Sequence, residues 1–144
     1  KADYDNLPLD PVTIVSGKLP NAPDAQASGS IEYETAVSSS LRLRSNFTYT
    51  YRGNYFSSLN NLRQTTVGSP AGPVTIPYDR VRGFGYADAR IALGSENGRW
   101  EAALFARNLF NNTYVEGYER DFFGTLIEGP GDPRTYGVEA TFRF

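Results

Sequence analysis

Hydrophobic and polar side chains alternate along several stretches of this chain. In residues 41–51 (LRLRSNFTYTY), leucine and aromatic side chains occupy the odd positions, and Arg, Asn and Thr occupy the even ones, with Ser45 as the exception. Successive side chains of a β-strand point to opposite faces, so a two-residue period sorts apolar and polar side chains onto separate faces. A helix would scatter them around its circumference. The pattern therefore predicts a long strand with one apolar and one polar face.

Four further stretches show the same alternation, at residues 25–37, 86–93, 99–110 and 135–144. The third is less regular, and in it we place Trp100, Ala102, Leu104 and Ala106 on the apolar face. No stretch has the spacing of an amphipathic helix. We expect an all-β fold, an antiparallel up-and-down meander of about five long strands.

The connections between these strands are alternately short and long. Residues 38–40 and 95–98 form tight turns, and the second contains an Asn-Gly hairpin dipeptide. Residues 56–81 and 111–133 read as long loops, as do residues 1–24, with a short strand at 12–15. Short and long connections alternate in this way in outer-membrane β-barrels. We therefore expect a single partial domain over residues 1–144 that forms part of a transmembrane barrel.

Alternation alone does not decide what covers the apolar face. In a soluble β-sandwich that face packs a core, and in a membrane barrel it contacts lipid while the polar face lines the lumen. The predicted strands are long, and aromatic side chains occupy the ends of the apolar stripes, as in the aromatic girdles of barrels. Opposite charges on the polar face suit a polar lumen, although a solvated surface would carry them equally well.

Composition narrows the possible chemistry. The 144 residues include no Cys, His or Met, so thiolate nucleophiles, Ser-His-Asp triads and Cys/His zinc sites are excluded. The formal net charge of -2 gives no attraction to nucleic acid. Mean hydropathy is -0.44, a value compatible with strands that are apolar at every second position. We expect no enzymatic activity, no catalytic residue, no metal site and no cofactor.

Two segments near the end of the chain resemble one known family. Residues 100–114 (WEAALFARNLFNNTY) and 131–144 (GDPRTYGVEATFRF) are similar to the last two strands of TonB-dependent outer-membrane receptors. Residues 17–23 (GKLPNAP), ahead of a strand, and 51–53 (YRG), at the end of one, also fit this family. The resemblance depends on Asn108, Leu109, Phe110, Tyr114, Pro133, Arg134, Tyr136 and Gly137.

The resemblance implies a location and a set of partners. Receptors of this family are barrels of about 22 strands, closed by an N-terminal plug, that import siderophores, vitamins or oligosaccharides across the bacterial outer membrane. TonB drives them through an N-terminal box. This chain has neither plug nor box, and five strands are too few to close a barrel. Its expected partners are the remaining strands, the plug and outer-membrane lipid, with TonB acting only through the missing part.

The last strand has a further expected partner. Barrel-assembly machinery pairs with the final strand of a nascent barrel, and this requires an apolar stripe that ends on an aromatic residue. Tyr136, Val138, Phe142 and Phe144 supply that stripe, with the small Ala140 as its weak point. The alternative is that these are ordinary core residues.

The two long loops hold the candidate ligand-binding residues. Aromatic and Arg side chains are enriched at binding surfaces, although loop residues also pack on one another. The candidates are Tyr78, Arg80, Tyr118, Arg120, Phe122 and Phe123. Two other functions stay open: a small autonomous outer-membrane barrel acting as an adhesin or structural protein, and a soluble β-sandwich that binds carbohydrate.

Overall fold

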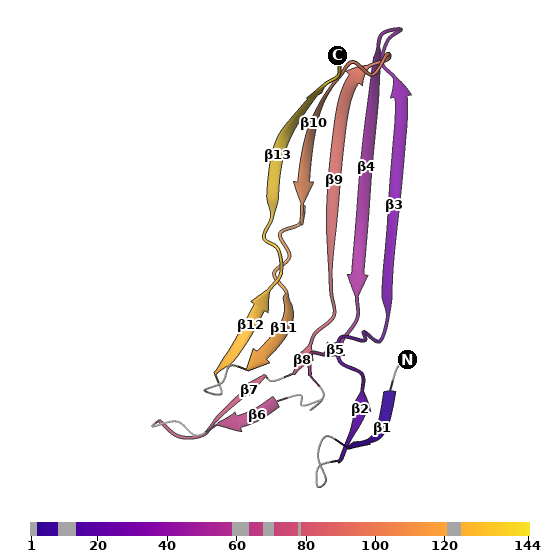
Figure 1. Ribbon diagram of the computed structural model, residues 1–144. Helices are drawn as coiled ribbons and strands as arrows, with labels where there is room; N and C mark the ends of the chain where they lie inside the picture. Colours follow the sequence, from indigo (N-terminus) through magenta and orange to yellow (C-terminus); the bar gives the residue numbers. More distant parts are fainter. Residues whose placement is uncertain (1–2, 9–13, 59–63, 68–70, 78, 121–124) are drawn as a thin grey trace. The chain divides into compact units, whose positions relative to one another are not determined.

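A computed structural model describes residues 3–8, 14–58, 64–67, 71–77, 79–120 and 125–144 (Figure 1). In this part of the chain every regular element is a β-strand. No described helix is long and apolar enough to cross a membrane. The chain divides into two compact units: Lys1–Gln26, Arg52–Phe84 and Thr113–Gly131 form the first, and Ala27–Tyr51, Gly85–Asn112 and Asp132–Phe144 form the second.

The second unit contains the main sheet. Its five strands lie in the order β13-β10-β9-β4-β3, and consecutive neighbours run in opposite directions (Figure 1). This confirms the predicted all-β meander of five strands. The strands are β3 (Gln26–Ala36), β4 (Leu41–Arg52), β9 (Phe84–Ser95), β10 (Trp100–Arg107) and β13 (Thr135–Phe142).

The register of the sheet keeps apolar positions together. Leu104 lies opposite Ile91 on one side and Val138 on the other, and Trp100 lies opposite Phe142. Directly opposed residues point to the same face of an antiparallel sheet, so these pairs form transverse apolar rows. The same register places Glu101, on the other face, within one continuous polar surface.

Both predicted tight turns are present at one end of this sheet. The 38–40 turn joins β3 to β4, and the 95–98 turn joins β9 to β10. The Gly98 amide donates to the Ser95 carbonyl oxygen at 2.9 Å, and Gly98 has φ +69°. That dihedral lies in the left-handed region, which Gly adopts without steric cost.

The three segments that the sequence predicts as long loops contain short strands. Each folds into short hairpins: β1 (Asp3–Pro8) with β2 (Ile14–Lys18), β5 (Tyr55–Phe56) with β8 (Arg80–Val81), β6 (Gln64–Val67) with β7 (Val74–Pro77), and β11 (Val115–Arg120) with β12 (Leu126–Pro130). These strands have two to six residues, too few for a clear alternating pattern. The short strand expected at 12–15 begins at Ile14, and residues 12 and 13 lie outside the described residues.

Large apolar side chains are not buried in the second unit. Its buried residues, among those described, are Ala87, Ala92, Gly94, Ala103 and Asn108. In contrast, twelve large side chains at the alternating apolar positions are more than a third exposed. They are Ile31, Tyr33, Val37, Tyr49, Tyr51, Ile91, Leu93, Leu104, Tyr136, Val138, Phe142 and Phe144. The sheet therefore presents an apolar face without a core beneath it.

Candidate functional site

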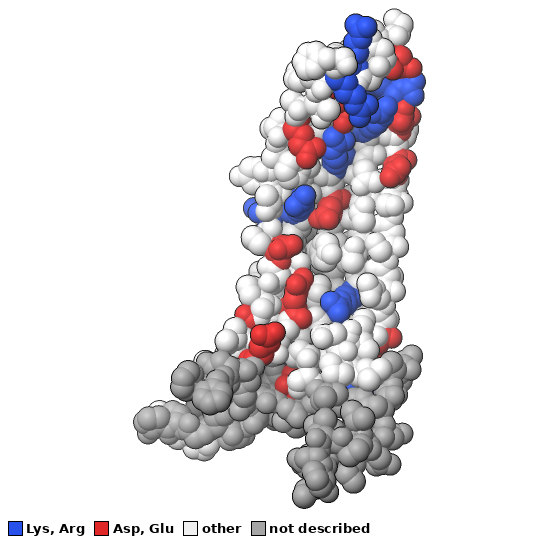
Figure 2. All heavy atoms as spheres, in the orientation of Figure 1, with Lys and Arg blue, Asp and Glu red and all other residues white. Residues whose placement is uncertain are grey.

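The polar face of the main sheet carries a chain of ion pairs that reaches all five strands. Four glutamates and three arginines alternate along it, so that each arginine bridges two carboxylates. Figure 2 shows basic and acidic side chains interspersed on this face. The members, in order, are Glu96, Arg42, Glu34, Arg44, Glu101, Arg90 and Glu139.

The geometry of the network is set by strand alternation. Arg42 and Arg44 are two residues apart on β4, so both point to the polar face, and Glu34 on the neighbouring strand pairs with both. Arg44 Nη1 donates to Glu101 Oε2 at 3.0 Å, and Arg90 Nη2 donates to Glu101 Oε1 at 2.8 Å. Both Glu101 oxygens are thus engaged, which ties β4 and β9 to β10.

Glu96, in the tight turn after β9, ends the network. Arg42 Nε donates to Glu96 Oε2 at 2.8 Å, and Arg42 also pairs with Glu96 Oε1. The hydrogen bond from Arg42 lowers the pKa of Glu96. The turn carboxylate is therefore ionised at neutral pH and holds this end of the sheet to β4.

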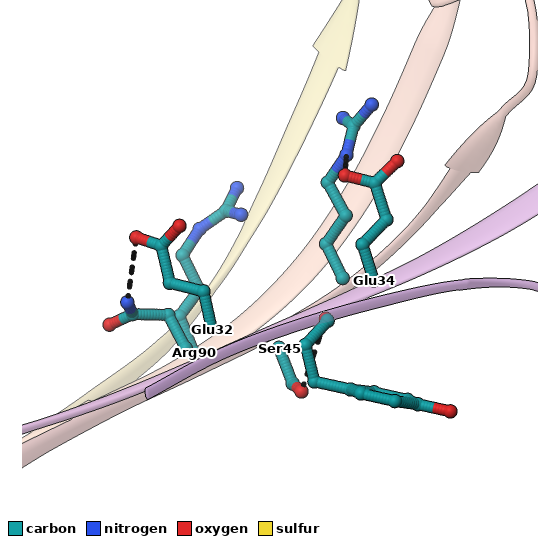
Figure 3. Close-up of a pocket in the computed structure, with 7 residues that line it drawn as sticks. Glu32, Glu34, Ser45 and Arg90 are labelled. Carbon is teal, nitrogen blue, oxygen red and sulfur yellow. Dashed lines mark hydrogen bonds and ion pairs between the residues drawn. The ribbon is translucent and has the colours of Figure 1, made fainter. Parts of the chain in front are cut away.

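A hollow of about 280 Å³ lies in the polar face beside β3 (Figure 3). In Figure 3, Glu32, Glu34 and Arg90 stand on one side of the strands and Ser45 on the other. Asn46 Nδ2 donates to Glu32 Oε1 at 3.2 Å. Because its carboxylates are paired with arginine or amide donors, the hollow offers matched charges rather than an unpaired acid or base for catalysis.

The chemistry of the described residues fits a binding or lining surface. Among them, no group of three or more Asp or Glu side chains is placed to hold a metal ion. The network has four negative and three positive members, so it is nearly neutral as a unit. The ion-pair network itself therefore carries no large excess of charge.

The opposite face is the exposed apolar surface. Of the residues expected to serve the terminal strand, Tyr136, Val138 and Phe142 are 78%, 74% and 67% exposed. They project from β13 on the same face as Leu104, with Phe144 exposed beyond the strand end. The structure thus brings the expected stripe together and leaves it uncovered.

Asn108 is the most constrained of the residues that carry the family resemblance. It is 3% exposed and has φ +47°, and its backbone amide donates to Asp88 Oδ1 at 3.0 Å. Its side-chain amide donates to the carbonyl oxygens of Asn112 and Asp132, both at 2.9 Å. The Asn112 amide donates to Asn108 Oδ1 at 3.0 Å. One side chain therefore fixes the end of β10 and the approach to β13.

The hydrogen bonds of Asn108 lie where β10 ends, and this end differs from the predicted one. The alternating pattern predicts a strand to residue 110, but β10 ends at Arg107. Asn108 and Asn111 both have left-handed φ values, so the chain turns there. Leu109 lies within the turn and donates its backbone amide to the Ala87 carbonyl at 2.7 Å, while Phe110 is exposed.

Gly137 permits a close aromatic contact on the polar face. Its register partner is Phe105, and a Cβ built on Gly137 would lie 2.8 Å from the Phe105 ring. The Arg107 guanidinium lies 5.8 Å from the centroid of that ring. The glycine thus leaves space for a stacked aromatic and cation.

Tyr114, in the first unit, makes a similar contact. Its ring stacks on Phe84 with centroids 4.2 Å apart, and a Cβ on Gly131 would collide with it. Pro133 and Arg134 lie in the exposed link to β13.

The candidate ligand residues of the loops are only partly visible. Tyr78, Phe122 and Phe123 lie outside the described residues, and for Arg120 only the backbone, at the end of β11, is described. Arg80 lies opposite Phe56, and Tyr118 lies opposite Glu128. Loop packing is evident, because Ser57 Oγ donates to the Tyr118 carbonyl at 3.1 Å and the Tyr55 hydroxyl donates to that of Glu116.

Sequence reasoning missed the structural roles of Asn108, Phe105 and Glu96. Phe105 was hidden because it is an aromatic residue on the polar face. The adjacent Gly137 and the Asn-rich run at 108–112 are the signals that could have revealed these contacts.

Comparison of the chain with protein-family models, curated proteins and solved structures gave no match.

Proposed function

We propose that this chain forms part of the wall of a bacterial outer-membrane β-barrel, within a TonB-dependent receptor that takes up a siderophore, vitamin or oligosaccharide. It acts as a non-enzymatic structural and binding element, without a cofactor. The observation that carries the proposal is the pairing of an exposed apolar face with an ion-paired polar face on one sheet.

The apolar face needs a non-aqueous environment. Burying one Val, Leu or Ile side chain contributes about 1.5–3 kcal/mol, and the row of Val138, Leu104 and Ile91 is about half or more exposed. Contact with lipid would recover this free energy without a second protein layer. Trp100 and Phe142 form the row next to the tight turns, where barrels carry an aromatic girdle.

The polar face suits a water-filled lumen. An exposed ion pair contributes little, about 0–1 kcal/mol, so the network is not needed for stability alone. Its alternating charges keep arginine and glutamate satisfied on a surface that lipid could not solvate.

The unpaired edges of the sheet show what a closed barrel would require from further strands. Within the described strands, β3 and β13 each pair on one side only, and an unpaired edge in lipid costs several kcal/mol per backbone group. Five alternating strands make β3 and β13 parallel to each other (Figure 1). An antiparallel closed barrel therefore requires an odd number of further strands.

The alternatives fit the geometry less well. A β-sandwich needs a second layer over the apolar face, where Val138 and Tyr136 are instead about three-quarters exposed. A small autonomous barrel needs three more strands of about 9–11 residues, whereas the additional described strands have two to six. The receptor assignment itself rests on the resemblance of residues 100–114 and 131–144.

Cell fractionation tests the proposal. The polypeptide carrying this chain should be recovered in the outer-membrane fraction and should need detergent to stay folded. A detergent-free monomer with a cooperative thermal transition would refute the membrane assignment. Loss of nutrient uptake when TonB is deleted would support the receptor assignment, and unchanged uptake would contradict it.

A further inference from the structure

A second hollow lies on the polar face at the tight-turn end of the main sheet. Three arginines, Arg42, Arg44 and Arg143, line it together with Thr141, Ser95 and the single carboxylate Glu101. Figure 2 shows arginine side chains, in blue, gathered at this end. Including Arg99, four arginines here oppose Glu34, Glu96 and Glu101, which leaves one net positive charge.

The excess charge is concentrated in one cross-strand pair. The Arg143 backbone amide donates to the Arg99 carbonyl at 2.8 Å, one residue beyond the Trp100–Phe142 pair. Like charges directly opposite each other destabilise a sheet. Among the described residues neither guanidinium forms an ion pair or a hydrogen bond. An external anion would relieve this repulsion.

The remaining donors point to the kind of anion. Arg143 Nη1 lies 3.9 Å from the Cβ position of Gly98, so its guanidinium sits over the Asn-Gly turn. Arg44 uses Nε and Nη1 for glutamates, which leaves Nη2. The Thr141 hydroxyl makes no hydrogen bond with described residues. Glu101, in turn, has both oxygens occupied by Arg44 and Arg90.

We propose that this hollow binds a phosphate group. A guanidinium fork matches phosphate oxygens in a bidentate manner, and a second guanidinium and a hydroxyl supply further donors to a tetrahedral oxyanion. The phosphate belongs either to a solute or to an anionic phospholipid headgroup. Only the lipid source rests on the proposed membrane location. It requires the headgroup to reach the polar face around the turn end of the sheet, past Trp100, which lines the hollow.

Arginine-specific modification with phenylglyoxal, read for each residue by mass spectrometry, tests the site. The protein is held in octyl glucoside micelles, which contain no phosphate, and inorganic phosphate is compared with sodium chloride at equal ionic strength. At tenfold excess over its dissociation constant, phosphate should slow Arg143 modification about tenfold. Arg134, an exposed arginine outside the hollow, should react at an unchanged rate.

Equal rates for Arg143 with and without phosphate, or equal slowing of Arg134, would overturn the proposal. Equilibrium dialysis with radiolabelled phosphate gives a second measurement: Arg143→Gln should lose saturable binding, and the matched control Arg134→Gln should keep it. The wild-type modification rates do not depend on whether either variant folds.

Vesicles distinguish the two sources. Protection of Arg143 in phosphatidylglycerol bilayers, but not in phosphate-free galactolipid bilayers, would identify a lipid headgroup. Protection by dissolved phosphate alone would identify a solute. Protection in neither setting refutes the site. If the protein fails to enter bilayers while phosphate still protects Arg143 in micelles, the membrane assignment fails and the phosphate site stands.

Discussion

Replacement of Leu104 by arginine should distinguish a lipid-facing sheet from a water-facing one. Leu104 projects from the middle of β10, is 57% exposed and lies between Ile91 and Val138. In water, a substitution at such an exposed position changes the unfolding free energy by less than about 0.5 kcal/mol. In a bilayer the same arginine would enter hydrocarbon.

The expected cost follows from the depth of the residue. Leu104 lies four residues beyond Trp100, so it is about 14 Å further along the strand at roughly 3.4 Å per residue. A strand tilt of about 40° converts this to about 10 Å of depth, close to the midplane of a 25 Å apolar band. Arginine at that depth costs about 2–4 kcal/mol.

Phe142→Arg is the matched control, because Phe142 is on the same face in the interfacial row. It should cost about 0–1 kcal/mol. Equilibrium unfolding by guanidinium, with the complete polypeptide folded in phosphocholine bilayers, measures both values. Small and equal changes for Leu104→Arg and Phe142→Arg would refute the claim that this face contacts lipid.

Three further outcomes follow from individual contacts. Asn108→Ala removes three side-chain hydrogen bonds and should lower the unfolding free energy by about 3 kcal/mol. A loss below about 1 kcal/mol, measured by urea unfolding, would contradict a stabilising role for these hydrogen bonds. Gly137→Ala should cost about 1–3 kcal/mol through collision with Phe105, and a double-mutant cycle with Phe105→Ala should recover most of that loss, whereas additive costs would argue against the contact. Burial raises the pKa of Tyr55 and Tyr118, so the folded state holds these protons more tightly than the unfolded state. The protein should therefore lose stability as the pH rises above about 10. Tyrosinate absorbance should show two late-titrating groups, and titration of all tyrosines together would contradict this.

The five long strands could be predicted from the sequence because each holds a period-two pattern over eight or more residues. β4 illustrates this, since its pattern fixes both faces and its ends fall at Leu41 and Arg52. The same pattern sorted the glutamates and arginines onto one face, so the polar surface was predictable as a surface. Which glutamate pairs with which arginine was not, because pairing depends on the register between strands.

The alternation of apolar and polar residues did not reveal the short strands or the left-handed backbone dihedral angles. The β11–β12 hairpin has only five or six residues in each strand and a register shift near Val115, so no alternation stands out. The end of β10 depends on the left-handed φ of Asn108 and on its bond to Asp132, which lies 24 residues away. Such distant contacts have no local sequence signal.

A single-cysteine scan along β10 tests the central claim most directly, because the chain has no cysteine of its own. Each position from Glu101 to Ala106 would carry a fluorophore in turn, with the complete polypeptide in bilayers that contain nitroxide lipids. We predict quenching by the nitroxide at even-numbered positions and not at odd-numbered positions. Of the odd-numbered positions, 101 and 105 should instead react with a water-soluble maleimide, whereas position 103 is buried. Uniform quenching along the strand, or none at the even-numbered positions, would contradict a sheet with one face in lipid and the other in water.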